Sequence, residues 1–192
     1  AEIGGISPGS MPAGTSSLSE EGVVLSPRLL FESGESRMDQ LGELLRSSSH
    51  PSRQPDQNLA DLSAQVASLR QGTEAMEALV REHGENELAE QMDALREESS
   101  ASCAKFIKEM GECEFSTIQT LDDGDCLALR VTVEKGRATF DFSGTASARP
   151  DNLNATEAIV TSAVCYGLRL LIGKDLPLNE GLLEPADLII PE

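Results

Sequence analysis

The sequence of 192 residues contains no tryptophan, a single tyrosine, and only 15 basic residues against 33 acidic ones. The formal charge of −18 argues against nucleic acid or an anionic membrane as a partner, because both repel an acidic surface. No apolar run approaches the roughly 20 residues that a membrane-spanning helix needs. The length is that of a single domain with a core of its own.

Cysteines are few, and their spacing predicts neither disulfides nor a metal finger. The four thiols form no C-x-x-C pair: Cys103, Cys113, Cys126 and Cys165. Cys165 falls in an apolar helical stretch, where a free thiol behaves as a small hydrophobe. We therefore expect four unpaired cysteines and a reducing, cytoplasmic location.

The clearest pattern present is an alternation of apolar and polar residues from Leu127 to Phe142, interrupted by Lys135-Gly136. Folding the two runs about that dipeptide aligns all apolar side chains on one face, whereas a slip of one residue would mix the faces. The pattern predicts a β-hairpin with one buried face and these pairs: Leu129 with Phe142, Val131 with Phe140, Val133 with Ala138, Arg130 with Asp141, and Glu134 with Arg137.

Residues 154–172 follow with apolar side chains on nearly every side of a helix, which is typical of a helix buried in a core. Asn152 or Asn154 is the predicted N-cap, and Gly173 follows the last turn. The chain then ends in an apolar, strand-like run, and its abrupt ends suggest a piece of a longer protein.

The first 109 residues divide into a loop region and a helical region. Residues 1–36 are a Gly/Ser/Pro-rich loop with short strands, among them a strand over 23–31 broken by Pro27. The glycine-rich start could cradle a phosphate, but it lacks the spacing of a P-loop. The alternative is a loop that needs unusual backbone dihedrals.

Residues 37–109 predict a short helix from Met38 to Leu45, a mobile Ser/Pro loop, and two long helices that meet near His83-Gly84. The long helices predict an antiparallel αα-hairpin whose outer, Glu-rich faces are solvated. The predicted fold class is α+β: an antiparallel hairpin and sheet packed on a buried helix, with the acidic αα-hairpin inserted. We expect one domain in three segments, 1–36, 37–109 and 110–192.

Residues suited to nucleophilic or acid–base catalysis are scarce. The two histidines, His50 in the Ser/Pro loop and His83 beside a helix-ending glycine, have no neighbouring G-x-S-x-G elbow. Both are expected to face solvent. On composition and spacing alone, the interpretation stops at an α+β domain.

Several blocks, in order, resemble the hydantoinase B/oxoprolinase family, and most closely its 5-oxoprolinase branch. They are EIGGISPGSMP (2–12), EEGVV (20–24), NLADLSAQV (58–66), FDFSGT (140–145), NLNA (152–155) and DLPLNEGLLEP (175–185). The resemblance covers nearly the whole chain. It implies an internal fragment of the B-type region of an enzyme that opens a small cyclic amide at the expense of ATP.

The resemblance also implies cofactors and partners. The parent protein would use ATP with Mg²⁺ and a divalent metal, and ATP would belong to a companion A-type region or subunit. The fragment itself is expected to bind no cofactor and to be inactive alone. A homo-oligomer is left open.

The family's usual His-His-Ala-Asp-Ile-Gly-Gly motif is matched here only in its tail, with Glu2 in place of aspartate. The histidines would precede Ala1, so Glu2 is a weak metal candidate. Leu182 stands where the oxoprolinase pattern has cysteine, which removes a thiol role there. Catalytic residues are unknown, and the candidates for the substrate pocket are Gly4, Gly5, Gly9, Asn152 and Asn154.

Two other hypotheses stay open. The acidic αα-hairpin could dock a partner in a non-catalytic interaction module. Alternatively, the parent could be a subunit of an ATP-dependent ketone carboxylase, which the same family includes.

Overall fold

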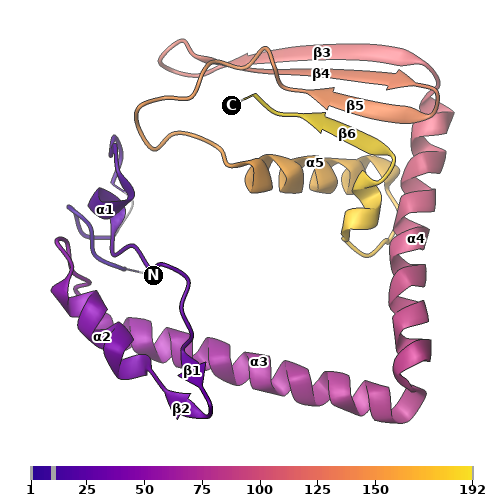
Figure 1. Ribbon diagram of the computed structural model, residues 1–192. Helices are drawn as coiled ribbons and strands as arrows, with labels where there is room; N and C mark the ends of the chain where they lie inside the picture. The colour runs from indigo at the N-terminus through magenta and orange to yellow at the C-terminus, as the bar shows by residue number, and fades with distance from the viewer. Residues whose placement is uncertain (1, 10–11, 192) are drawn as a thin grey trace. The chain divides into compact units, whose positions relative to one another are not determined.

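The computed structural model describes residues 2–9 and 12–191, which form two compact units (Figure 1). Unit 1 runs to Leu79 and takes in the distant segment Arg149–Asn154. Unit 2 consists of Val80–Ala148 and the residues from Ala155 onward. The boundaries therefore fall inside a long helix and just ahead of another, and the single domain of three segments stays a prediction.

Unit 1 is a glycine-rich loop packed beside short helices. Its small apolar core is formed by Val23, Leu41 and Leu45, against which Leu59 and Leu62 pack. Its elements are α1 (Leu18–Glu21), β1 (Phe31–Glu32), β2 (Glu35–Ser36), α2 (Met38–Ser47) and the greater part of α3 (Pro55–His83).

The strand predicted over residues 23–31 is wrong. Val23 donates its N–H to the carbonyl of Ile3 at 2.9 Å, but no regular strand follows it. The strands of this region are the two-residue pair β1 and β2. They are joined by Ser33 and Gly34, both at positive φ (52° and 85°), which is the geometry of a tight hairpin turn.

Unit 2 is a four-stranded sheet in the order β3-β4-β5-β6, with α5 covering one face (Figure 1). The first three strands are antiparallel, whereas β6 runs parallel to β5 after the crossover through α5. The elements are α4 (Glu85–Met110), β3 (Cys113–Thr120), β4 (Cys126–Glu134), β5 (Arg137–Asp141), α5 (Glu157–Ile172), η1 (Glu180–Leu183) and β6 (Ala186–Ile189). The α+β class is confirmed.

The predicted hairpin register is confirmed over the whole length of β5. Lys135 and Gly136 have φ of 51° and 77°, as a two-residue turn with the twist of the strands requires. Leu129 and Phe142 lie beyond the last pair of the ladder. The paired residues are Arg130 with Asp141, Val131 with Phe140, Val133 with Ala138, and Glu134 with Arg137.

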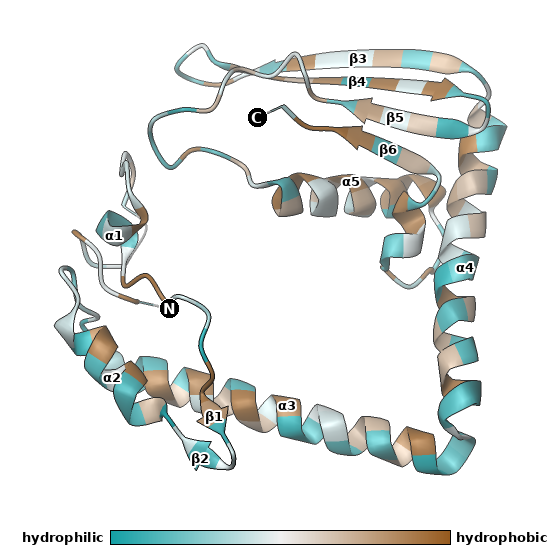
Figure 2. Ribbon diagram, in the orientation of Figure 1, coloured by the Kyte–Doolittle hydropathy of each residue, from teal (hydrophilic) through white to brown (hydrophobic). Residues whose placement is uncertain are grey.

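The prediction that α5 is buried on nearly every side is wrong. One side of α5 packs into the unit 2 core through Val164, Cys165 and Leu168. The opposite side exposes large apolar residues, although Figure 2 shows the helix as largely apolar along its length. They are Ile159 (62% exposed), Tyr166 (56%) and Leu170 (57%).

The caps of α5 agree with the sequence at one end only. Gly173 adopts the left-handed conformation and ends the helix, as predicted. At the other end the cap is Thr156, whose hydroxyl oxygen accepts from the Ile159 N–H at 3.4 Å, rather than Asn152 or Asn154. Both asparagines are engaged elsewhere, as described below.

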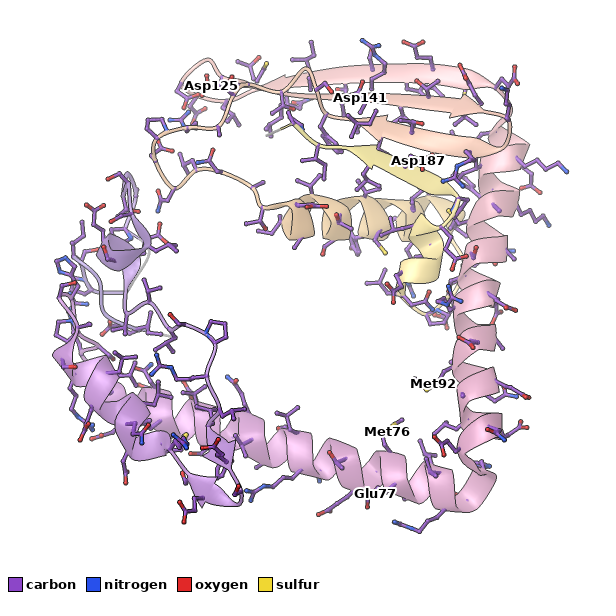
Figure 3. All side chains as sticks on the ribbon, in the orientation of Figure 1. Met76, Glu77, Met92, Asp125, Asp141 and Asp187 are labelled. Carbon is purple, nitrogen blue, oxygen red and sulfur yellow. The ribbon has the colours of Figure 1, made fainter. Side chains whose placement is uncertain are left out.

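The break between the long helices is confirmed, because α3 ends at His83 and α4 begins at Glu85. Several apolar side chains along them are exposed, such as Leu69 (72%), Met76 (44%) and Met92 (55%). Figure 3 labels Met76 on α3 and Met92 on α4. The packing of the two helices as an antiparallel hairpin stays a prediction.

All four cysteines are free thiols, as predicted. Burial, with a smaller contribution from neighbouring Cys165, raises the pKa of Cys103 to about 11. This thiol is therefore a component of the core and a poor nucleophile at neutral pH. None of the described helices combines the length and apolar character that crossing a bilayer requires.

Candidate functional site

The N-terminal loop owes its glycines to close approaches between backbone segments of unit 1. Gly4 and Gly5 have φ of 98° and 96°. A Cβ on Gly4 would lie 2.2 Å from the carbonyl oxygen of His50, and one on Gly5 would lie 2.6 Å from that of Glu21. Gly9 also has a positive φ, 95°, but a Cβ there would meet open space. Only the first two glycines are therefore required by packing as well as by conformation.

Arg53, just before α3, ties this loop together. Its guanidinium donates from Nη1 to Glu2 Oε1 (3.2 Å) and to the Ser7 carbonyl (3.2 Å), and from Nη2 to the Gly5 carbonyl (2.8 Å). The planar guanidinium fork suits such a set of acceptors, which a point charge on a flexible stem does not reproduce. Arg53 thus fixes the path of the chain from Glu2 to Ser7.

Asn58, in the first turn of α3, adds a buried polar anchor to the same loop. Its Nδ2 donates to the Glu2 carbonyl at 2.8 Å, and its Oδ1 accepts from the Ser52 hydroxyl at 2.5 Å. Asn58 and Ser52 are each only 7% exposed. The loop of residues 48–54, predicted to be mobile, is therefore bonded and packed against the N-terminal segment.

The side chain of Asn152 joins the far segment of unit 1 to the N-terminal loop. Its Nδ2 donates to the Pro12 carbonyl at 2.9 Å, and its Oδ1 accepts from the Gly14 N–H at 3.2 Å. Both polar atoms of the amide are therefore used on backbone about 140 residues earlier in the sequence. Asn152 acts as a clamp on the loop.

The segment that carries Asn152 has an ordered turn of its own. Asn154 donates to the carbonyls of Arg149 (3.0 Å) and Asp151 (2.7 Å), so its amide serves the turn. Asp151 accepts from the Arg149 guanidinium and from the Leu153 N–H. These two bonds, that from Arg149 foremost, hold the pKa of Asp151 below its usual range.

All six residues singled out from the sequence lie in unit 1, although they come from both ends of the chain. Arg53 joins Glu2 to Gly5, and the Gly4 N–H is bonded to Glu2. Further along, Asn152 is joined to Pro12 and Gly14. Gly9 lies between these two groups, exposed. Asn154 takes part only through the turn that it stabilises.

Glu2 does not fit a metal site on the residues that the structure describes. Its Oε1 already accepts from the Gly4 N–H at 2.5 Å and pairs with Arg53. The described residues also include no group of three or more His, Cys, Asp or Glu side chains able to hold an ion. A single carboxylate beside a guanidinium supplies too few ligands for a divalent metal.

Sequence reasoning missed Arg53, and it misjudged His50. Arg53 stands in a stretch assigned to a mobile loop, and no periodicity marks it. Asn58 opens the family-like block of residues 58–66, which was its only signal. His50 is half-buried rather than solvent-facing, and its backbone carbonyl accepts from the Gly5 N–H at 3.2 Å. His83 is exposed, as predicted.

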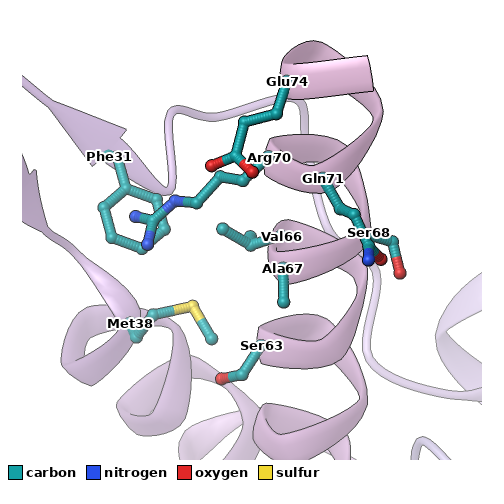
Figure 4. A pocket seen from close by; sticks show the side chains of 9 residues that line it. All are labelled: Phe31, Met38, Ser63, Val66, Ala67, Ser68, Arg70, Gln71 and Glu74. Carbon is teal, nitrogen blue, oxygen red and sulfur yellow. The ribbon is translucent and has the colours of Figure 1, made fainter.

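A separate open depression lies beside α3 (Figure 4). The Arg70 guanidinium stands over the Phe31 ring, 5.3 Å from its centroid, in a cation–π contact. Met38 and Val66 add apolar surface to its wall. It includes none of the six residues predicted from the sequence.

Fold and loop define an α+β protein whose glycine-rich N-terminal segment is held in shape by polar side chains. The chain belongs to the hydantoinase B/oxoprolinase family, whose sequence model matches residues 1–192. It is 36% identical over 203 residues to the 5-oxoprolinase of Saccharomyces cerevisiae, and 31% identical over 215 residues to 5-oxoprolinase 1 of Arabidopsis thaliana. Each alignment covers all of this chain, but only 16% and 17% of the relative.

A solved structure has the same fold. The crystal structure of an ATP-dependent caprolactamase from Pseudomonas jessenii matches the whole of this chain with a TM-score of 0.80, at 18% identity and over 33% of its own length. The chain therefore spans about a sixth of the 5-oxoprolinases that it matches and a third of the caprolactamase chain.

Proposed function

We propose that this chain is part of a longer enzyme that couples ATP hydrolysis to the opening of a cyclic amide, 5-oxoproline or a close analogue. The observation that carries the proposal is the family match over every residue of the chain. Two further findings support it: the relatives named 5-oxoprolinase and the fold shared with a caprolactamase.

Within that enzyme, the clamped residues 2–9 and 12–14 form part of the wall of the lactam pocket. Five residues shape this wall: Gly4, Gly5, Gly9, Asn152 and Asn154. Three side chains hold the wall in place through hydrogen bonds: Arg53, Asn58 and Asn152. Opening an unstrained lactam requires activation of its carbonyl, and phosphorylation of the carbonyl oxygen would provide a leaving group. The task of this chain is then to bind and orient the ring.

The nucleotide and the metals belong to other parts of the assembly. An A-type region or subunit would bind ATP with Mg²⁺, and a divalent metal would need ligands beyond Glu2. The isolated chain is expected to bind Mn²⁺ or Zn²⁺ only weakly. In a calorimetric titration, tight stoichiometric binding that Glu2→Gln abolishes would contradict this.

Activity assays on the chain and on a longer protein that contains it would test the proposal. The longer protein, with its A-type region, should release glutamate from 5-oxoproline only when ATP is present. The 192-residue chain should neither hydrolyse ATP nor open the ring. An inactive longer protein, or an active isolated chain, would contradict the proposal or its division of labour.

A second candidate is a non-catalytic interaction module in which the acidic helices dock a partner. The exposed Leu69 and Met76, both on the unit 1 part of α3, favour it, because large apolar side chains on surface helices often mark an interface. The ketone carboxylase branch would be supported if the longer protein carboxylated a ketone instead of opening a lactam. A cytoplasmic location and a homo-oligomer remain parts of the proposal for the longer protein.

A further inference from the structure

The side of α5 that faces away from the unit 2 core carries an apolar stripe. Ile159, Ala163, Tyr166 and Leu170 follow one another at intervals of four, three and four residues. These intervals place them in one line along a helix of 3.6 residues per turn. All four are exposed, and three are exposed by more than half: Ile159 (62%), Tyr166 (56%) and Leu170 (57%). The stripe therefore runs along most of the helix.

No charged residue falls within this stripe. The charged residues of α5 are Glu157, in its first turn, and Arg169. The Arg169 guanidinium serves the connection after the helix, where it donates to the Leu176 carbonyl (2.8 Å) and to Asp175 (3.4 Å). In α4, by contrast, the exposed apolar residues stand among acidic ones, as is usual on a solvated helix. A helix that is apolar on nearly every side is typical of a core.

An open depression adjoins the C-terminal part of the stripe. Its volume is about 520 Å³, and Tyr166 contributes to its wall from α5. The opposite wall comes from the connection after the helix, where Leu178 is 57% exposed. A depression beside a line of apolar side chains can receive one large side chain of a docked helix.

The spacing of the stripe fits a second helix. Side chains at intervals of three and four residues interlock with the same pattern on a neighbouring helix. Ala163 is small and lies between large side chains, which leaves a hole for a side chain of that neighbour. The side chains of an extended strand alternate with a period of two and do not match these intervals.

Most of each relative lies outside the region that this chain matches. The chain covers 16% and 17% of the two 5-oxoprolinases and 33% of the caprolactamase chain. A second copy of this chain is less suited to cover the stripe, because each copy carries a formal charge of −18 and like charges oppose association.

We propose that the outer stripe of α5 docks an apolar helix from the remainder of the longer protein, and that the depression beside Tyr166 receives one large side chain of that helix. The proposal rests on the part of the proposed function that makes this chain a piece of a longer protein. It does not depend on the reaction that the longer protein catalyses.

Thiol labelling at two matched positions tests the docking surface. Ala163→Cys places a thiol on the stripe, and Ala158→Cys places one on the same helix, also at an exposed position. The two positions are about 140° apart around the helix axis. Each variant is made in the 192-residue chain and in the longer protein, and its rate of reaction with iodoacetamide is compared between the two. Mass spectrometry of the peptides separates these thiols from the native cysteines.

Ala163→Cys should react at least about tenfold more slowly in the longer protein than in the 192-residue chain, because the docked helix must open before the thiol is reached. The rate for Ala158→Cys should be the same in both. Circular dichroism would show that each variant is folded, and Leu170→Cys offers a second position on the stripe if Ala163→Cys does not fold.

Three results would overturn the proposal. The first is an unchanged rate for Ala163→Cys in the longer protein. The second is protection of both positions, because one helix along the stripe leaves Ala158 open. The third is protection of Ala163→Cys in the 192-residue chain that increases with its concentration, which would identify a second copy as the occupant. A longer protein that opens no lactam would overturn the proposed reaction alone.

Discussion

Unit 1 is held largely by polar bonds between side chains and backbone, whereas unit 2 is built around an apolar core. Among the described residues, the unit 2 core contains ten buried residues from α4, α5, the connection that follows α5, η1 and the sheet, and the unit 1 core contains three. Unit 1 relies instead on three side chains that bond to a loop far from them in the sequence: Arg53, Asn58 and Asn152.

The difference has an energetic consequence. A hydrogen bond contributes only about 0.5–1.5 kcal/mol net to stability, whereas full burial of a large apolar side chain contributes about 1.5–3 kcal/mol. Unit 1 should therefore open at lower cost than unit 2, as is usual for regions that bind ligands. Its polar bonds provide a defined loop shape, which an apolar core alone does not specify.

The largest effect is expected in the unit 2 core. Leu182 is fully buried at 0% exposure, so Leu182→Ala should destabilise unit 2 by about 3–5 kcal/mol through lost burial and a cavity. Leu178→Ala is a matched control, because that side chain is 57% exposed and should cost under about 0.5 kcal/mol. Urea unfolding followed by the fluorescence of Tyr166, the only tyrosine, would report on unit 2. Equal losses would contradict the core assignment.

A smaller effect, confined to unit 1, is expected at the packed glycines. Gly4→Ala should cost about 2–4 kcal/mol, because its Cβ would meet the His50 carbonyl oxygen in addition to the positive φ. Gly9→Ala suffers only the conformational strain, about 1–2 kcal/mol. Thermal unfolding by circular dichroism should rank them so, with the Tyr166 transition unmoved in both. A Gly4 variant that lowers the Tyr166 transition would show that the units are coupled.

The sequence predicted the hairpin of unit 2 well, for a physical reason. Alternation with period two, together with a turn of two residues, leaves one register that keeps the faces unmixed, and the observed pairs follow it. The outer side of α5 was misassigned because hydropathy reports what a side chain prefers, not what covers it. Ile159 and Leu170 are as aliphatic as the buried Val164, yet their side chains are 62% and 57% exposed.

The loop of unit 1 was only partly predictable. Its glycines stand out in the sequence, but the contacts of Arg53 with Glu2 and of Asn152 with Pro12 span 51 and 140 residues. Neither contact follows a helical or strand period, so local patterns do not reveal it. The NLNA block drew attention to Asn152, whereas its role as a clamp is visible only in three dimensions.

Removing the Asn152 clamp should have a smaller effect than either change above. Asn152→Ala removes the bonds to Pro12 and Gly14, at a cost of about 1–2 kcal/mol for two hydrogen bonds. The rate of hydrogen exchange at the Gly14 amide should rise, because this amide loses its acceptor. Asn152→Asp keeps the acceptor and loses only the donor, so it should give an intermediate result. If both variants exchange like the wild type, the clamp does not hold the loop.

The smallest effect is a dependence on pH that should differ between the units. In the folded chain, the bond from Arg149 lowers the pKa of Asp151 below the value of about 3.9 of an unfolded chain. Its contribution to stability is therefore present above about pH 4 and is lost as the pH falls through the lowered pKa. Asp151→Asn should remove this loss of stability at low pH. The stability contribution to hydrogen exchange at the Gly14 amide should then depend less on pH below about pH 4.

Asp187 offers the matched comparison, since its bond with Arg137 lowers its pKa in unit 2 in the same way. Asp187→Asn should change the acid-side unfolding of unit 2, followed by Tyr166, and leave the Gly14 amide unaffected. The side chain of Asp187 is 55% exposed and that of Asp151 is 24% exposed, so water and salt reach both carboxylates, and each effect should be modest and should shrink further at high salt. A pH dependence at Gly14 that Asp187→Asn alters as much as Asp151→Asn would mean that acid opens both units together.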